Sequence, residues 1–299
     1  MSKARELADV IGTQGTTEQV LSGRRNWIIN GDFQVSQRGD FATSPVVVSN
    51  DNYSVDRWQH AGYGYATVQK LNGYLRMSSN QSTNHCFYTQ QKVEDFGKRF
   101  NGQTITISGK CNTNSSNLRL WMFEGSAWSD KGSITGDFSF TFTYVKQDSY
   151  DHSGIRFAIS DPSSPNVATS IANGEYFELS EVQLELGSVA TPFEHRSYGE
   201  ELALCQRYYQ YHGNNQQMLI GWSYCGTNEH CWGSFQFPKM RVAPTATYTG
   251  QAHSNCAGDI TVSGIATTPS SLEYMNIAPT SLPAGYFVSV PNLWLDAEL

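Results

Sequence analysis

Charged residues are scarce in this sequence of 299 residues. Only 16% of the residues are charged, against roughly 25% in an average soluble domain. The formal net charge is −7, and the basic residues are scattered apart from the pair Arg24 and Arg25. A protein that binds nucleic acid needs a basic patch to meet the phosphates. We therefore expect no nucleic-acid partner.

Long apolar runs are missing as well. No stretch approaches the roughly 20 apolar residues of a membrane-spanning helix. The first residues, from Met1 to Leu7, lack the apolar segment of a secretory signal. We expect a protein that does not insert into a membrane and that folds in a cytoplasm. Its six cysteines should be reduced there.

Spacings that hold zinc or carry catalysis are also absent. Cys225, His230 and Cys231, with His253 and Cys256 further on, could be imagined around zinc, but the sequence contains no Cys-x-x-Cys pair. It contains no Gly-x-Ser-x-Gly, no His-Glu-x-x-His and no phosphate-binding glycine loop. We predict no metal site and no catalytic residues, so we do not expect an enzyme.

A glycosidase would need two carboxylates close together. Glu181 and Glu185 fall on one face of an expected strand, where four residues span about 13 Å at a rise of roughly 3.3 Å each. Glycoside hydrolysis uses carboxylates roughly 5–9.5 Å apart. A polysaccharide depolymerase is therefore the least favoured hypothesis.

Oxygen ligands for calcium are few. Glu185, Asn30 and Asp32 could offer oxygen atoms to a calcium ion, whose role would be structural. Calcium takes six or more oxygen ligands, and only three are named, so solvated side chains at strand ends are the alternative. We expect no cofactor.

The region between residues 26 and 197 shows apolar residues at every second position. Such alternation is typical of strands with one buried face, and turn signals such as Asn101-Gly102 and Asp161-Pro162 separate the runs. The alternating sets are Ile105 and Ile107; Leu118, Leu120 and Met122; Phe138, Phe140, Phe142 and Tyr144; and Ile155, Phe157 and Ile159. The pattern predicts an antiparallel β-sandwich of jelly-roll type.

The alternation changes phase once near Ser180 and Glu181. Phe177 and Leu179 have one parity, whereas Val182, Leu184 and Leu186 have the other. A β-bulge at this point would return all five side chains to the core.

The sequence outside the sandwich predicts an N-terminal helix and a second β domain. Ser2 to Ile11 is predicted to form a short helix that Ser2 can cap, with Ala4, Leu7 and Ile11 on one face. Ten residues are too few for a stable isolated helix, so the helix must dock on partner copies or on its own domain. The polar linker up to residue 25 favours a partner.

Residues 198–299 predict a smaller second β domain. A connecting helix over residues 200–210, with Leu202, Cys205 and Tyr209 on one face, leads into a strand. Further strands are expected at 218–224, 232–237, 246–249, 260–263, 271–275 and 286–295. The whole chain is thus mainly β, with a helix and linker in residues 1–25, a jelly roll in 26–197 and a β domain in 198–299.

Aromatic residues in weakly charged loops are candidate platforms for sugars. A sugar site needs exposed aromatic faces beside amide or carboxylate groups. Trp128 lies in Gly-Ser-Ala-Trp-Ser-Asp-Lys, which reads as a loop. In the second domain the candidates bracket a predicted hairpin: Trp222, Tyr224, Asn228, His230 and Trp232. Alternatively, Trp222 and Trp232 fill the domain core or a subunit interface.

Several motifs resemble those of phage tail-fibre proteins. Asn-Trp-Ile-Ile-Asn-Gly-Asp-Phe at residues 26–33, Gln-Arg-Gly at 37–39 and Tyr-Ser-Val-Asp-Arg-Trp at 53–58 resemble the start of a domain common in these fibres. Residues 182–194 and 199–209 resemble the end of its jelly roll and the start of a C-terminal domain, and residues 237–245 a motif of that domain. Lys3 to Ala8 is similar to anchoring helices of marine-phage structural proteins. Residues 59–175 carry no such motif.

The resemblance implies a homotrimeric virion fibre made in the host cytoplasm. The helix with Ala4, Leu7 and Ile11 would bind other virion proteins, and the β domains would bind host surface polysaccharide. The first domain also resembles a carbohydrate-binding module, although a shared fold implies function only weakly. The alternative is a purely structural neck, baseplate or capsid fibre. The motif aromatics Phe33 and Trp58 are expected to fill the core.

Overall fold

The computed structural model describes most of the chain. The described residues are 24–39, 41, 44–71, 73–146, 152–213, 218–222, 230–249, 252–253, 261–277, 287–290 and 292–298. The predicted N-terminal helix with Ala4, Leu7 and Ile11 lies outside them. The chain divides between Glu201 and Leu202 into two compact units, and each is described by itself. No helix in the described ranges is long and apolar enough to span a membrane.

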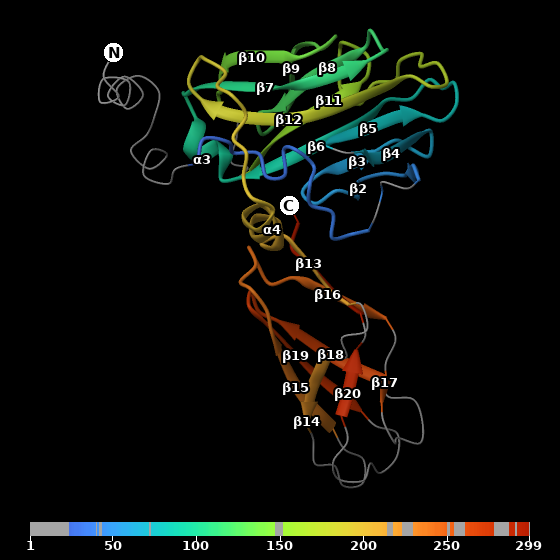
Figure 1. Ribbon diagram of the computed structural model, residues 1–299, viewed down its shortest axis with the longest axis vertical. Helices are drawn as coiled ribbons and strands as arrows, with labels where there is room; N and C mark the ends of the chain where they lie inside the picture. Colours follow the sequence, from blue (N-terminus) through green and yellow to red (C-terminus); the bar gives the residue numbers. More distant parts are fainter. Residues whose placement is uncertain are drawn as a thin grey trace, which may run out of the picture. The chain divides into compact units, whose positions relative to one another are not determined.

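The first unit is a β-sandwich of two six-stranded antiparallel sheets (Figure 1). The sheet named here the β12 sheet has the order β1 (Val46–Val48), β4 (Ala66–Leu71), β5 (Tyr74–Ser79), β12 (Tyr176–Leu186), β7 (Thr104–Thr113) and β10 (Phe138–Thr143). The β11 sheet has the order β2 (Asn52–Tyr53), β3 (Gln59–Ala61), β6 (Phe87–Glu94), β11 (His152–Ile159), β8 (Leu118–Phe123) and β9 (Trp128–Ser133). This architecture confirms the predicted β-sandwich of jelly-roll type.

The alternating residues form the core between the two sheets. The sets from β7, β8 and β11 are fully buried: Ile105, Ile107, Leu118, Leu120, Met122, Ile155, Phe157 and Ile159. Phe140 and Phe142 are only partly buried and pack against the core. They belong to β10, an edge strand of the β12 sheet, where fewer neighbours cover a side chain.

A β-bulge interrupts β12 where the sequence changes phase. The pairing of β12 with β7 shifts register between Ser180 and Gln183, and Glu181 has a φ of 50°. Leu179 and Val182 are consequently both fully buried. The predicted bulge is confirmed, and of the five predicted core residues Leu186 alone is only partly buried.

The motif residues of the first 60 positions meet in one buried cluster. Asn30 has a φ of 59°, and its side chain accepts a hydrogen bond from the Val35 backbone nitrogen at 2.9 Å. It donates to the backbone oxygens of Val35 at 2.8 Å and Asp56 at 2.9 Å. The indole nitrogen of Trp58 donates to the Asn30 backbone oxygen at 2.8 Å, and the Phe33 and Trp58 ring centroids lie 4.9 Å apart. These residues therefore hold the fold together, as expected of core fillers.

The first and last segments of the sandwich are bound to each other. Glu194 accepts hydrogen bonds from the backbone nitrogens of Asn26 at 2.7 Å and Arg25 at 3.1 Å. The Trp27 backbone nitrogen donates to the Leu184 backbone oxygen at 2.9 Å. Gly31 is in close contact with the Val182 backbone, since an added Cβ would lie 2.2 Å from the Val182 oxygen.

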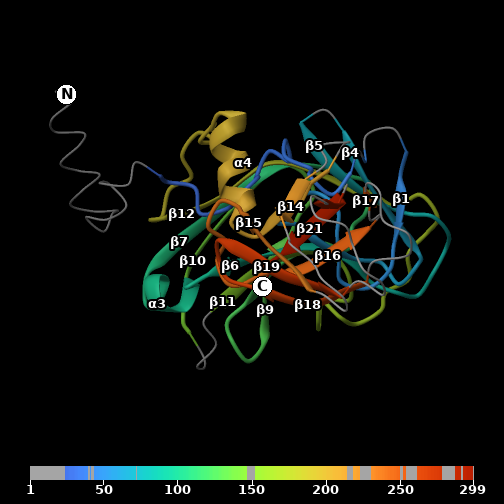
Figure 2. The same ribbon diagram turned by 90° about the horizontal axis from the view of Figure 1, so that it is seen from below.

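A short helix that the sequence analysis did not predict lies at one end of the sandwich (Figures 1 and 2). It is α3 (Phe96–Phe100), and Phe96 and Phe100 are fully buried. The Phe96 ring meets the Tyr144 ring edge-on, with centroids 4.7 Å apart. The helix closes the core where β6 ends.

The second unit contains three small antiparallel sheets in its described residues. They are β13 (Tyr209–His212), β21 (Asn292–Asp296) and β16 (Thr245–Thr249); β14 (Met218–Trp222), β20 (Phe287–Val290) and β17 (Ala252–His253); and β15 (His230–Gln236), β19 (Ser271–Ile277) and β18 (Thr261–Thr267). Helix α4 (Tyr198–Gln206) precedes them. Tyr209, expected on the helix face, is wrongly placed by that prediction, because it starts β13 and pairs with Asp296.

Candidate functional site

The outward face of the β11 sheet carries a row of large polar and aromatic side chains. Gln59 on β3 pairs with Gln90 on β6, Gln90 pairs with Arg156 on β11, and Arg156 pairs with Trp121 on β8. Since Ile155 and its parity mates face the core, Arg156 and its row face outward. Four neighbouring strands thus place these side chains beside one another.

A hollow of about 300 Å³ opens on this face. Its lining comes from β3, β6, β8, β9 and β11 and from the turn before β2: Asp51, Gln59, Tyr88, Gln90, Lys92, Phe123, Trp128, Gly154 and Arg156. The Trp128 ring lies over Gly154, since a Cβ added to Gly154 would be 3.7 Å from that ring. We name this hollow the Arg156 hollow.

Arg156 lies between two aromatic rings at the centre of the hollow. Its guanidinium carbon is 3.6 Å from the Tyr88 ring centroid and 4.0 Å from the Trp128 ring centroid. Nε donates to the Gln90 side-chain oxygen at 2.8 Å, and Nη1 donates to the Asn166 side-chain oxygen. Burial lowers the pKa of Arg156, but a guanidinium stays charged at neutral pH. The hollow therefore contains a fixed, desolvated cation.

Hydrogen bonds fix the side chains around Arg156. Gln90 also donates to the Gln59 side-chain oxygen, and the Tyr88 hydroxyl donates to Asp51 at 3.2 Å. Burial raises the pKa of Tyr88 above its ordinary range, so the hydroxyl keeps its proton. Trp121 is buried under the same face, and its indole nitrogen has no acceptor within the described ranges. Such a donor is satisfied by an ordered water or by a ligand oxygen.

An exposed aromatic stack contributes to the surroundings of the hollow. Tyr63 is 41% exposed and stacks on His85, with ring centroids 5.9 Å apart. His85 stacks in turn on Tyr65 at 4.5 Å. Partial burial raises the pKa of Tyr63, and Arg156 and Asp51 lie close enough to influence it. Tyr63 thus offers a ring face to solvent near the cation.

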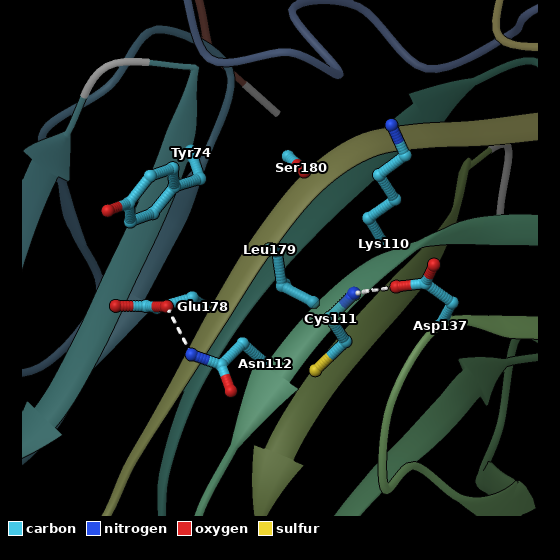
Figure 3. A pocket seen from close by; sticks show the side chains of 8 residues that line it. All are labelled: Tyr74, Lys110, Cys111, Asn112, Asp137, Glu178, Leu179 and Ser180. Atoms are coloured by element: carbon cyan, nitrogen blue, oxygen red, sulfur yellow. Dashed lines mark hydrogen bonds between the residues drawn. The ribbon is translucent and has the colours of Figure 1, made fainter.

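A second, smaller hollow of about 180 Å³ lies on the β12 sheet (Figure 3). In Figure 3 the Asn112 amide donates to Glu178 at 2.8 Å, and the Cys111 backbone nitrogen donates to Asp137 at 3.2 Å. Burial raises the pKa of the Cys111 thiol to about 12, so this thiol is not a nucleophile at neutral pH. The carboxylates of this hollow are bound by protein groups, which makes it the weaker candidate.

The structure brings one predicted sugar-binding residue into the Arg156 hollow. Trp128 lines it, but the residue is not in a loop as expected. It begins β9 and pairs with Phe123, because the hairpin between β8 and β9 needs only the four residues from Glu124 to Ala127 as its turn.

The other predicted sugar-binding residues cannot be assembled into a site. Trp222 ends β14, while His230 and Trp232 lie in β15, and their side chains are outside what the structure describes. Tyr224 and Asn228 lie outside the described residues altogether. Among the described residues β14 pairs with β20 and β15 pairs with β19, and the turn of the predicted hairpin lies outside them.

The three candidate calcium ligands each have protein partners. Asn30 is engaged by Val35 and Asp56 as described above. Glu185 accepts hydrogen bonds from the backbone nitrogen and the hydroxyl of Thr191, and Asp32 accepts one from the Gln34 amide at 2.9 Å. These contacts use Asn30 Oδ1, both Glu185 oxygens and Asp32 Oδ2, whereas Asp32 Oδ1 is buried without a hydrogen-bond partner in the described ranges.

Sequence reasoning missed Tyr88, Gln90 and Arg156, although a signal was present. Phe87 and Tyr88 are adjacent and large, so β6 carries aromatic residues on both of its faces. In β8, Trp121 likewise places a large aromatic residue on the face opposite to the core residues Leu120 and Met122. A strand with apolar residues on both faces indicates that its outer face is also covered or hollowed.

Comparison with known proteins gives likeness in fold alone. No family model and no curated protein matches the sequence. A CBM4 module is 15% identical, with a TM-score of 0.32 over 53% of this chain and 98% of that chain. The CBM22-1 xylan-binding domain from Paenibacillus barcinonensis is 11% identical, with a TM-score of 0.31 over 51% and 100%. The enzymatically active domain of tailspike protein 4 from bacteriophage CBA120 is 12% identical, with a TM-score of 0.32 over 54% of this chain and 21% of that chain. Likenesses at this level assign no function.

Proposed function

We propose that this chain is a phage fibre protein whose sandwich binds a glycan of the host surface in the Arg156 hollow. The arrangement of Arg156 between Tyr88 and Trp128, with the amides of Gln90 and Gln59 beside them, supports this proposal. A hollow lined by aromatic rings and a few fixed polar groups is the usual form of a small-ligand site. Hydroxyl groups of a sugar can both accept from and donate to such groups.

The fibre part of the proposal rests on the sequence motifs. Of the matching residues, Asn30 and Trp58 belong to the buried cluster, and the Val182 backbone nitrogen donates to the adjacent Gly31 backbone oxygen at 2.9 Å. They would define a scaffold shared with tail fibres. In this view the protein is a homotrimer in the virion. The N-terminal helix with Ala4, Leu7 and Ile11 binds other virion proteins, and the protein acts without catalysis, metal or cofactor.

One observation favours the purely structural alternative. The motif residues Asn30, Gly31 and Trp58 fill and fasten the core, and they do not line the Arg156 hollow. The resemblance therefore supports a shared scaffold more directly than a shared ligand. A neck, baseplate or capsid fibre would use the same scaffold without binding a receptor.

Binding to cells separates the two hypotheses. The fluorescently labelled full-length protein is mixed with candidate host cells, beside a variant that lacks residues 1–25 and a Trp128→Ala variant. We expect the first two to stain cells and Trp128→Ala to stain them weakly. Removal of surface polysaccharide should abolish staining. If no form stains any candidate host, the structural appendage is the better account.

A further inference from the structure

Arg156 is a buried cation that forms no ion pair with a carboxylate among the described residues. The residue is only 5% exposed. Two of its five N–H groups are used, and both acceptors, the side-chain oxygens of Gln90 and Asn166, are neutral. In the part of the chain that the structure describes, no carboxylate forms an ion pair with it. Three N–H groups are left for another acceptor.

Other arginines of the sandwich differ in this respect. Arg76 forms an ion pair with Glu178 at 3.1 Å, Arg119 pairs with Asp130, and Arg196 pairs with Glu201 at 3.3 Å. Burial of a charge is costly unless an opposite charge is supplied. The site around Arg156 is therefore built in a form that an anion would complete.

The local charge of the hollow is opposite to that of the protein. Lys92 and Arg156 line it, and Asp51 is the one acidic side chain in its described lining. Asp51 accepts the hydrogen bond of the Tyr88 hydroxyl. The whole chain carries a net charge of −7, so general electrostatics would repel a polyanion. Binding of a polyanion would thus need a specific cationic site such as this one.

Geometry restricts how a ligand reaches the cation. The two faces of the guanidinium are covered by Tyr88 and Trp128, so a ligand meets its edge, where the N–H groups lie. The edge of a guanidinium matches the two oxygens of a carboxylate in a bidentate pair. A neutral sugar stacks instead on an open ring face, and the ring faces turned toward Arg156 are occupied.

From these observations we infer that the Arg156 hollow recognises the carboxylate of a uronic acid in an acidic polysaccharide. This inference rests on the proposed glycan-binding function and names the class of glycan. The edge of Arg156 would bind the carboxylate, and the Gln59 and Gln90 amides and the exposed Tyr63 ring would contact neighbouring hydroxyl groups and sugar faces.

Matched polymers test the inference on the full-length protein. Affinity electrophoresis measures binding to polygalacturonate, to alginate and to hyaluronate, each beside the same polymer with its carboxylates esterified. We expect at least one acidic polymer to bind about 10- to 100-fold more tightly than its ester, since hydrogen bonds to charged groups are the stronger ones. Salt at about 0.5 M should weaken that binding.

Variants locate the binding. Arg156→Gln should lose the preference for the acidic polymer over its ester. Arg156→Lys should keep part of that preference, because lysine retains the positive charge but cannot form the two parallel hydrogen bonds of a guanidinium. Arg76→Gln is the matched control, since Arg76 also lies over a ring, that of Tyr176 at 4.1 Å, on the β12 sheet. It should bind as the parent does. Thermal unfolding of each variant checks that it is folded.

Each remaining outcome counts against a defined claim. Binding to esters and acids alike, or to a neutral glucan alone, would overturn the inference and leave the proposed glycan-binding function standing. Acid-specific binding that survives Arg156→Gln would also overturn it. Binding to no acidic or neutral polymer would contradict the proposed function itself.

Discussion

The guanidinium carbon of Arg156 lies 3.6 Å from the centroid of the Tyr88 ring. The two residues come from neighbouring strands, β11 and β6, and Tyr88 is itself only 5% exposed. A cation over a ring face is held by about 0.5–1 kcal/mol at an exposed site and by about 2 kcal/mol or more when desolvated. The pair fixes the position of the cation before any ligand arrives.

Two replacements of Tyr88 should distinguish the contribution of its ring to ligand affinity from that of its hydroxyl. Tyr88→Phe keeps the ring and loses the hydrogen bond to Asp51, so affinity for an acidic polysaccharide should stay within about threefold. Tyr88→Leu loses the contact with the cation, and affinity should fall about 3- to 30-fold. Titration calorimetry measures both. Equal affinities of the two variants would contradict a role for the ring.

Trp128 should matter through its indole face. Trp128→Ala opens one side of Arg156 to water, so we expect affinity to fall about 3- to 30-fold, whereas Trp128→Phe should keep most of it. Phe123→Leu is the comparison within the hollow, because the Phe123 ring lines it and packs against Trp128, with centroids 5.2 Å apart, while Arg156 lies over Trp128. If Phe123→Leu weakens binding as much as Trp128→Ala does, the hairpin as a whole matters, and the contact with the cation does not.

His60 should make the stability of the protein depend on pH. Complete burial lowers the pKa of His60 from 6.5 to about 3, and neither ring nitrogen has a hydrogen-bond partner among the described residues. Below pH 6.5 the unfolded chain binds a proton that the folded chain does not, so stability falls as the pH drops toward 3. The expected loss between pH 7 and pH 5 is about 2 kcal/mol.

The variant His60→Leu isolates this contribution. Because leucine does not titrate, the difference in unfolding free energy between parent and variant should change by that amount from pH 7 to pH 5 in urea unfolding. A difference that stays constant with pH would show that His60 is not the group responsible.

Gly31 should not tolerate a side chain. An added Cβ would lie 2.2 Å from the Val182 backbone oxygen, so Gly31→Ala must displace one of the two segments, at a cost of about 1–3 kcal/mol or more. Gly136→Ala is the control, since nothing lies within 4 Å of the added atom, and it should be neutral or slightly stabilising. Thermal unfolding compares them. Similar midpoints would contradict the close contact.

Adjacent glutamates at the start of α4 should differ strongly. Glu201 is buried and accepts hydrogen bonds from the Asn30 backbone nitrogen and from Arg196. Glu201→Ala leaves the buried Asn30 nitrogen without an acceptor and leaves Arg196 with Glu194 as its remaining carboxylate, so it should cost about 2–4 kcal/mol. Glu200 is exposed and completes a capping box with Ser197, so Glu200→Ala should cost about 1 kcal/mol. Urea unfolding ranks the two, and the reverse order would refute this account.

The interior of the sandwich could be predicted from the sequence because one physical period controls it. Ile155 and Phe157 alternate with outward residues, and the phase change at Glu181 indicated the bulge without any structural information. Helix α3 was missed because a helix of five residues shows too little of its period to be recognised. Its two phenylalanines read as isolated apolar residues.

The Arg156 hollow could not be assembled from the sequence for a different reason. Tyr88, Trp128 and Arg156 belong to three strands, and their proximity depends on strand order and register. Alternation fixes which face a residue occupies but not its neighbour across the sheet. Trp128 was chosen because small and polar residues surround it in the sequence. Nothing in that stretch of sequence indicates that Arg156 lies against its ring.

The hydrogen bonds that the Arg25 and Asn26 backbone nitrogens donate to Glu194 have a consequence for evolution. The chain arrives at the sandwich and leaves it at the same place, so the whole sandwich is a unit attached at one point. Domains with adjacent ends tolerate insertion into other proteins and permutation of their own sequence. Recombination could therefore replace this sandwich by one with a different binding surface without a change in the sequence on either side of it.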